Sequence, residues 1–175
     1  MNDCPRQNPA YRLALYSNFL GFFIMHVPVL CAEVIEALNI QPDGVYLDAT
    51  FGRGGHSQAI LQKLNAKGRL IAIDRDPEAL KSVNPVLAQD SRFKLHYANF
   101  CDLEKVVAYH RLTQKVNGIL LDIGVSSPQL DNAYRGFSFQ QEGPLDMRMD
   151  PTQGLSAAEW LKVAPEEDIA DVLKR

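Results

Sequence analysis

The sequence predicts an α/β fold in which helices cover both faces of a parallel β-sheet. Apolar strand patterns alternate with helical patterns from residue 28 to residue 125, a rhythm typical of parallel sheets. The apolar run Ile119–Leu121 is continuous, as expected for a parallel strand that is buried on both faces. A glycine-rich turn at residues 52–55 joins the first strand to a helix, which places backbone N–H groups over a small concavity.

Local patterns define the individual elements. Helices are predicted to begin at Pro28, near His56, at Asp76 and at Asp102. Proline and glycine within Gln41–Gly44 mark a turn, and Pro85 interrupts the helix that Asp76 caps. The predicted strands are Val45–Ala49, Arg69–Asp76, Phe93–Phe100 and Val116–Val125.

Right-handed crossovers between these strands predict the spatial order 3-2-1-4, with the first and fourth strands flanking the topological switch point. Ligands of such sheets bind beyond the carboxyl ends of the strands. Candidate binding residues fall at these ends, namely Asp48, Gly52, Gly54, Gly55, Asp74, Phe100 and Asp122. Their convergence predicts a ligand site at one edge of the sheet.

The glycine-rich turn indicates the ligand class. Ser57 stands where a dinucleotide fingerprint has its third glycine, and Asp48 lies four residues before Gly52. A carboxylate repels phosphate but attracts an ammonium or sulfonium group. The spacing D-x-x-x-G-x-G resembles motif I of S-adenosylmethionine-dependent methyltransferases, and Asp74 is suited to the two hydroxyls of a ribose. The turn therefore predicts S-adenosylmethionine as cofactor, with a loop-capping role as the alternative for Asp48.

The segment after Val125 changes character. Residues 132–151 are rich in glycine, proline and charge, and a loop of this length is usually functional or disordered. Apolar residues within it predict anchors for an ordered active-site loop, namely Phe137, Phe139, Leu145, Met147 and Met149. Two short helices are predicted next, over Ser156–Val163 and Pro165–Arg175, and we expect the second to be unfinished.

Composition bounds the function classes. The 175 residues are 46% hydrophobic and 22% charged with a net charge of −3, which argues against broad non-specific nucleic-acid binding. Three scattered cysteines without a C-x-x-C pair indicate a reducing compartment, without disulfides or a zinc site. His96, Cys101 and His110 could suggest a metal site, but we expect these side chains to occupy half-buried positions on a strand and a helix instead.

Residues 1–24 do not match the patterned chain. Arg6 and Arg12 precede the apolar Leu13–Met25, but Ser17 and Asn18 interrupt the run and no A-x-A-like cleavage site follows. The run is also too short to span a membrane. We expect Met25 to be the natural start and the preceding residues to be an upstream extension.

Six stretches carry a resemblance to a known family: His26–Leu30, Asp48–Ser57, Ala72–Pro77, Asp122–Asp131, Gly136–Phe139 and Gly143–Asp150. They closely resemble the bacterial MraW/RsmH family, over residues 26–175. The resemblance implies a Rossmann-like class I sheet and an S-adenosylmethionine-dependent methyltransferase. Its implied substrate is the exocyclic N4 of a cytidine in the decoding region of small-subunit ribosomal RNA. The implied partner is that RNA in the 30S particle, in the cytoplasm and away from membranes, and a homodimer is left open.

The resemblance also implies site residues. By position, its cofactor contacts fall on Gly54, Gly55, His56, Asp74, Phe100, Asp122 and Gln129. Other amino-group methyltransferases place a [DNS]-P-P-[YF] turn after the fourth strand, and Ser126–Gln129 looks like a variant of it. Ser126 and Ser127 are therefore candidate acceptors for the amine, with an ST-turn as the alternative. Asp146 is a candidate acceptor for its proton, with a salt-bridged loop as the alternative for Asp146–Asp150.

Four regions are expected along the chain. They are an extension (1–24), an S-adenosylmethionine-binding domain (25–131), an active-site loop (132–154) and the start of an inserted helical subdomain (155–175). Chains of the family are longer, so we expect a C-terminal truncation that leaves the edge of the fourth strand open and apolar. Two alternatives to the methyltransferase remain: an inactive fragment that only binds S-adenosylmethionine, and a nicotinamide-dependent dehydrogenase.

Overall fold

The computed structural model describes residues 28–174, so the predictions about residues 1–24 and about Met25 lie outside the described residues. The strands are β1 Val45–Asp48, β2 Arg69–Asp74, β3 Phe93–Tyr97 and β4 Gly118–Leu120. The α-helices are α1 Cys31–Leu38, α2 Gly55–Lys63, α3 Pro77–Lys81, α4 Pro85–Gln89, α5 Leu103–Tyr109, α6 Ser127–Asp131, α7 Ala157–Val163 and α8 Glu166–Lys174. Two 3₁₀ helices are η4 Phe100–Asp102 and η5 Ala133–Arg135.

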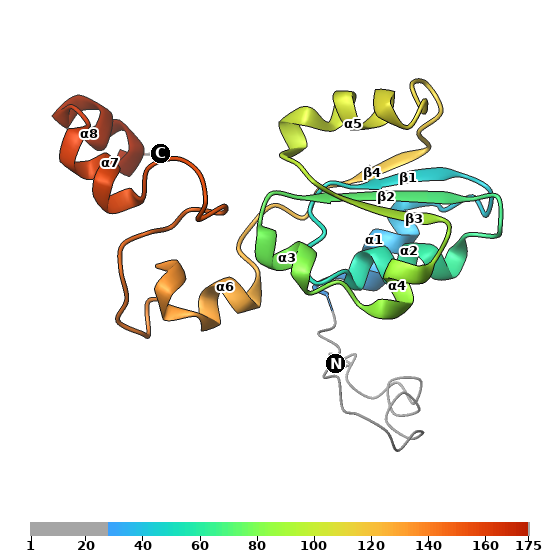
Figure 1. The fold of residues 1–175 in the computed structure, drawn as a ribbon, viewed down its shortest axis with the longest axis horizontal. Helices are drawn as coiled ribbons and strands as arrows, with labels where there is room; N and C mark the ends of the chain where they lie inside the picture. Colours follow the sequence, from blue (N-terminus) through green and yellow to red (C-terminus); the bar gives the residue numbers. More distant parts are fainter. Residues whose placement is uncertain (1–27, 175) are drawn as a thin grey trace, which may run out of the picture.

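The four strands form one parallel sheet in the order β3-β2-β1-β4, which confirms the predicted order. Helix α5 lies over one face of the sheet, and α1, α2, α3 and α4 lie over the other (Figure 1). The predicted α/β fold is therefore confirmed. Because the strands are parallel, their carboxyl ends meet at one edge, and the chain leaves that edge through α6 toward the more distant α7 and α8.

Alternating side chains of β1 and β2 build two separate apolar clusters. Tyr46 lies opposite Leu70, and both are buried in the larger cluster, to which α1, α2 and α4 contribute. Leu47 and Ile71, one residue further along each strand, belong to the smaller cluster on the α5 face. Burying one such side chain contributes about 1.5–3 kcal/mol. A register slip of one residue would move each side chain to the opposite face, so the packing of the two clusters fixes the pairing.

The fourth strand differs from its prediction. We predicted a strand over Val116–Val125 that is buried on both faces, but β4 has three residues and pairs with β1 alone within the described residues. Leu120 is buried, whereas Ile119 is 47% exposed and Leu121 is 43% exposed. No strand among residues 28–174 pairs with the other edge of β4, which matches the expected open apolar edge.

Three other boundaries also differ from prediction. Helix α1 begins later than expected, because Leu30 holds a left-handed backbone with φ 52°. Strand β2 ends at Asp74, and Asp76 caps α3 with its side chain. Strand β3 ends at Tyr97, and Phe100 opens η4. Strands end early here because polar residues at the carboxyl edge bond to neighbouring backbone instead of continuing the ladder.

Residues 28–174 contain no helix with the length and apolar character needed to cross a membrane. The same range contains no group of three or more histidine, cysteine or acidic side chains placed to hold a metal ion. His96 and His110 do meet, however: their Nε2 atoms lie 2.7 Å apart, and Tyr109 packs edge-on against both rings. One imidazole must donate this hydrogen bond and the other accept it, so at least one of them is neutral.

We predict that this histidine pair makes the fold acid-sensitive. Burial lowers the pKa of both side chains; Lys94 adds to the effect on His96, and His96, Lys94 and Arg69 add to it on His110. Because both pKa values lie below the unfolded value of about 6.5, the unfolded chain binds more protons there. The free energy of unfolding should therefore fall as the pH drops below about 6.5, toward the lower folded pKa values.

Urea denaturation between pH 7.5 and pH 5.5 measures this effect. The double variant His96→Asn, His110→Asn should lose most of the pH dependence, while Lys81→Ala, an exposed charge change outside the pair, should keep it. An unchanged slope in the double variant would assign the acid sensitivity to other groups.

Candidate functional site

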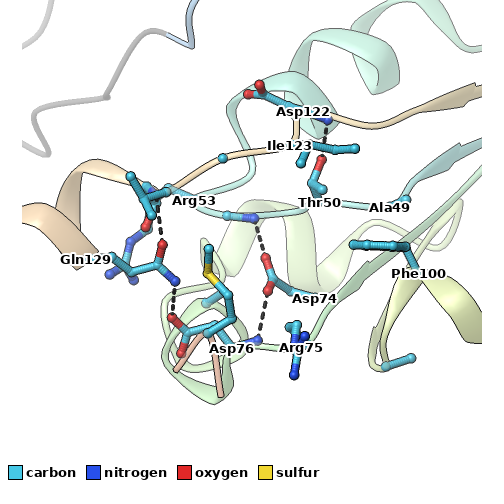
Figure 2. A pocket seen from close by; sticks show the side chains of 17 residues that line it. Ala49, Thr50, Arg53, Asp74, Arg75, Asp76, Phe100, Asp122, Ile123 and Gln129 are labelled. Carbon is cyan, nitrogen blue, oxygen red and sulfur yellow. Dashed lines mark hydrogen bonds between the residues drawn. The ribbon is translucent and has the colours of Figure 1, made fainter. Parts of the chain in front are cut away.

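A cavity of about 270 Å³ opens at the carboxyl edge of the sheet (Figure 2). Each strand end contributes to its wall: Gly52 follows β1, Asp74 ends β2, Phe100 follows β3, and Asp122 follows β4. Gln129 of α6 and Ser126 before it complete the predicted residues in the wall. Residues far apart in the sequence therefore converge on one site, as the end-of-strand rule predicts.

Asp74 is the central polar group of this wall. Its Oδ2 accepts the Gly52 N–H at 2.8 Å and its Oδ1 accepts the Asp76 N–H at 2.8 Å (Figure 2). A carboxylate offers about four acceptor positions. Asp74 can therefore hold the glycine-rich turn and still accept hydrogen bonds from a ligand in the cavity.

Several N–H groups in and before the glycine-rich turn bond within the protein. The Thr50 N–H donates to Asp48 Oδ1, and the Phe51 N–H donates to the Ile73 carbonyl oxygen. The Gly52 N–H donates to Asp74 Oδ2, and the Gly54 N–H donates to the Phe51 carbonyl oxygen. A turn that binds a pyrophosphate directs such groups at the ligand. Here a carboxylate takes the N–H of Gly52, in the cavity wall, which disfavours a dinucleotide and fits a cofactor with hydroxyls and a positive charge.

Asp48 lies behind the turn and outside the cavity wall. It is 1% exposed, and its Oδ2 accepts the Ser57 hydroxyl at 2.6 Å. Burial raises the pKa of Asp48, against the lowering effect of the hydrogen bonds from Ser57 and Thr50. The carboxyl group ties β1 to α2, so the loop-capping alternative describes its position better than direct contact with a ligand.

His56, Asp122 and Thr50 connect α2 to the end of β4. Asp122 donates its backbone N–H to Thr50 Oγ1 at 2.7 Å (Figure 2), and its carboxylate lies 3.6 Å from His56 Nε2. The Asp122 side chain is 59% exposed, whereas His56 is buried and does not line the cavity. The buried His56 side chain is thus placed to orient the Asp122 carboxylate.

The glycines of this turn have different structural roles. Gly52 lines the cavity, and a Cβ there would meet only the Thr50 carbonyl oxygen, at 3.9 Å. A Cβ on Gly54 would lie 2.7 Å from the Phe51 ring and 3.0 Å from Leu87. Gly54 therefore allows close packing of the core, and it caps α2 with φ 78°. Gly55 is the first residue of that helix and does not line the cavity either.

We predict that Gly54→Ala lowers the free energy of unfolding by about 2–3 kcal/mol. About 1–2 kcal/mol comes from the left-handed backbone and at least about 1 kcal/mol from the contact with the Phe51 ring. Gly124→Ala is the matched control, because a Cβ there meets nothing within 4 Å although Gly124 lines the cavity. Urea denaturation compares the two, and equal stability of both variants would contradict the packing role of Gly54.

A buried polar cluster fixes the wall on the α6 side. Asp76 Oδ2 accepts from Arg135 Nη1 at 2.7 Å and from Gln129 Nε2 at 2.8 Å. Arg135 Nη2 donates to the carbonyl oxygens of Arg148 and Met149. Gln129 in turn accepts the Ser126 N–H at 2.8 Å. One guanidinium thus connects the end of β2, α6 and the loop at residues 148–149, each of which contributes to the cavity.

The loop at residues 136–154 is held by polar contacts, contrary to the predicted apolar anchors. Phe139 is fully exposed, and Leu145 and Met147 are about half exposed. Buried Asp150 instead accepts a hydrogen bond from the Tyr97 hydroxyl. The predicted apolar anchoring was therefore wrong for Phe139, Leu145 and Met147, whereas Phe137 and Met149 are half-buried and Met149 lines the cavity.

Asp146, a predicted catalytic residue, lies in this loop and not in the cavity wall. It forms a two-pronged ion pair with Arg148, with Oδ2 2.6 Å from Nη2, and the same hydrogen bonds hold the pKa of Asp146 below its ordinary value. A carboxylate with a lowered pKa is a poorer proton acceptor. The other predicted acceptor, Ser127, opens α6, and only its neighbour Ser126 lines the cavity.

Several residues of the wall were not among the predicted site residues. They are Ala49, Thr50, Arg53, Arg75, Asp76, Ala79, Ala98, Ile123, Gly124, Val125 and Met149. Those next to a predicted residue in the chain could have been found from the same end-of-strand rule. Met149 could not, because it depends on how the long loop folds back.

Comparisons with known proteins show the family of this chain. A ribosomal RNA small subunit methyltransferase H from Pseudoalteromonas atlantica is 59% identical over 149 residues, which cover 85% of this chain and 48% of the relative. The chain thus spans about half the length of the curated relative it matches. A solved structure of a candidate rRNA-methylase from Clostridium thermocellum aligns with 46% of either chain at 15% identity and a TM-score of 0.40, which adds no argument. Residues 23–175 match the MraW methylase family, and the chain belongs to that family.

Proposed function

We propose that this protein is an S-adenosylmethionine-dependent methyltransferase that acts on N4 of a cytidine in small-subunit ribosomal RNA. The observation that carries the proposal is the cavity at the carboxyl edge, where Asp74 takes the Gly52 N–H and faces the ligand space. Membership in the MraW methylase family and the name of the relative support the substrate class.

The residues present fit this cofactor. Asp74 would accept hydrogen bonds from the ribose hydroxyls, and the partly exposed Phe100 ring offers a flat apolar surface to the adenine. Asp122 and Gln129 line the cavity as further polar partners, and a negative side chain favours a positively charged ligand. Bound S-adenosylmethionine supplies an electrophilic methyl group.

The chain's part in the reaction is to hold the acceptor nitrogen. The lone pair of a cytosine amino group is delocalised into the ring, so hydrogen-bond acceptors that orient its N–H groups favour attack. Ser126 is the predicted acceptor that lies in the cavity wall, and we assign this role to it. Roles for Ser127 and Asp146 stay predictions, since neither side chain is in that wall.

The proposal extends to the setting of the reaction. The partner would be ribosomal RNA of the small subunit, in the 30S particle of the cytoplasm. Residues 25–131 would form the cofactor domain, 132–154 the active-site loop and 155–175 the start of a helical subdomain. The two helices of that last region, α7 and α8, lie apart from the sheet (Figure 1).

Two measurements on the 175-residue chain test the proposal. Calorimetric titration with S-adenosylmethionine should show binding, and titration with NADH should show none. Incubation with tritiated S-adenosylmethionine and 30S subunits, followed by nucleoside mass spectrometry, should show N4-methylcytidine. Binding without transfer would favour a fragment that only binds the cofactor, and binding of NADH alone would favour a dehydrogenase.

A further inference from the structure

A second cavity, of about 590 Å³, adjoins the first through Arg53, which lines both. Its other walls come from the end of α6 and from η5, including Asp131, Asn132 and Tyr134. Because most of these side chains are polar and one is aromatic, the cavity is not suited to an apolar peptide face. Its chemistry is that of sites that bind single nucleotides, where a ring stacks on the base and polar groups meet its edge.

Tyr134 presents the aromatic surface of this cavity. The side chain is 80% exposed, yet the backbone beneath it is fixed. Its N–H donates to the Asn132 side chain at 3.1 Å, and Gly136 closes η5 with φ 75°. Its neighbour Arg135 is buried and holds Asp76. An exposed ring on a fixed backbone is a stacking platform that loses little freedom when a base binds.

Charge and hydrogen-bonding groups surround the ring. Arg53 donates to the Glu78 carbonyl oxygen, and the Glu78 carboxylate is paired with Lys81 at 2.8 Å. Arg53 is thus the cation available to a phosphate, whereas Asp131 would repel one and instead suits the amino group of a base. Gln141 adds an amide that can both donate and accept.

Buried Arg135 contributes a further observation. It lines the cavity with an exposure of 8%, and its Nε has no hydrogen-bond partner among residues 28–174. A buried N–H without a partner is costly, and such groups usually have a reason in function or in a bound molecule. The Nε itself is shielded from the cavity, so an acceptor atom of a ligand would reach it only after the Arg135 side chain shifts.

We propose that the second cavity binds a nucleotide of single-stranded RNA beside the methylated one, with its base on Tyr134 and its phosphate at Arg53. This rests on the proposed function, because Arg53 connects the cavity to the one assigned to the methyl donor. Direct stacking of a nucleotide beside the reacting base holds the RNA in register and selects an unpaired strand over a duplex.

Fluorescence anisotropy with fluorescein-labelled tetracytidylate at low salt tests the proposal. We expect Tyr134→Ala to weaken binding by about tenfold or more, the range measured for base stacking on aromatic side chains. Tyr134→Phe should restore binding to within about twofold, because the ring is retained. Tyr109→Ala is the matched control, since Tyr109 is 77% exposed on α5, outside both cavities, and should bind as the wild type does.

Calorimetry with S-adenosylmethionine on the same variants separates this proposal from the proposed function. Tyr134→Ala should bind the cofactor as the wild type does, because Tyr134 does not line the first cavity. Unchanged RNA binding in Tyr134→Ala, or no RNA binding by the wild type, would overturn the nucleotide site even if the cofactor binds. Loss of RNA binding in Tyr134→Ala would support the nucleotide site even if no methyl group is transferred.

Discussion

Replacing Arg135 by methionine is expected to lower the free energy of unfolding by about 3–5 kcal/mol, the usual cost of removing one partner of a buried ion pair. The guanidinium donates to Asp76 at 2.7 Å and to the carbonyl oxygens of Arg148 and Met149 at 3.1 and 2.9 Å. Methionine matches the aliphatic part of the arginine side chain but donates no hydrogen bond, so a buried carboxylate and two carbonyls lose a partner. Urea denaturation followed by circular dichroism measures the loss.

Arg148→Met is the matched control. Arg148 also pairs with an aspartate, Asp146, at 2.6 Å, but the two side chains are 25% and 16% exposed. Water can replace the lost partner there, so we expect a cost of about 1 kcal/mol or less. Combining Arg135→Met with Asp76→Asn should recover part of the stability, because no uncompensated charge then remains buried. A cost for Arg135→Met no larger than that of Arg148→Met would contradict the role of the buried pair.

The segment that Arg135 holds can also open without global unfolding. Hydrogen exchange reads this directly, because the amides of Gln129 and Leu130 both donate to the Ser126 carbonyl oxygen. We expect these two amides to lose protection in Arg135→Met and to keep it in Arg148→Met. Since Gln129 lines the first cavity, such opening would also loosen the wall of the proposed cofactor site.

The fold and the cavity at the carboxyl edge were predictable because they follow from periodic burial and strand order. Side chains such as Leu47 and Ile71 are apolar because helices cover the faces of a parallel sheet and bury them. Strand order follows from the handedness of crossovers. Asp74 and Phe100 were found because the ends of parallel strands meet in space. These signals are local in sequence or general to the fold class.

Arg135 was not predictable, because its burial depends on contacts that the sequence does not order. An arginine in a polar segment usually faces solvent, and Asp76 was interpreted as a helix cap. It is one: Oδ1 accepts the Glu78 N–H, while Oδ2 takes Arg135. For Asp48 the sequence pointed the other way. Its spacing from Gly52 predicts contact with a ligand, but its side chain is buried and bonds to Ser57.

Replacing Asp74 by alanine is expected to weaken binding of S-adenosylmethionine by about 100-fold or more. Hydrogen bonds to a charged group contribute about 1.5–3 kcal/mol each, and the proposal assigns the ribose hydroxyls to this carboxylate. Asp43→Ala is the control for charge, because Asp43 is exposed before the amino end of β1, at the opposite edge of the sheet. Calorimetry on both variants gives the ratio, and similar affinities would remove Asp74 from the site.

A loss of affinity in Asp74→Ala has two possible physical causes, because the carboxylate also holds the Gly52 and Asp76 N–H groups. S-adenosylhomocysteine and its 2′-deoxy analogue separate them. If Asp74 binds the ribose, the alanine variant should discriminate between the two ligands about tenfold less than the wild type does, since the partner of the 2′-hydroxyl is already gone. If Asp74 only supports the turn, both ligands should lose the same factor. We expect the first result, because each carboxylate oxygen accepts one backbone hydrogen bond and retains capacity toward the cavity.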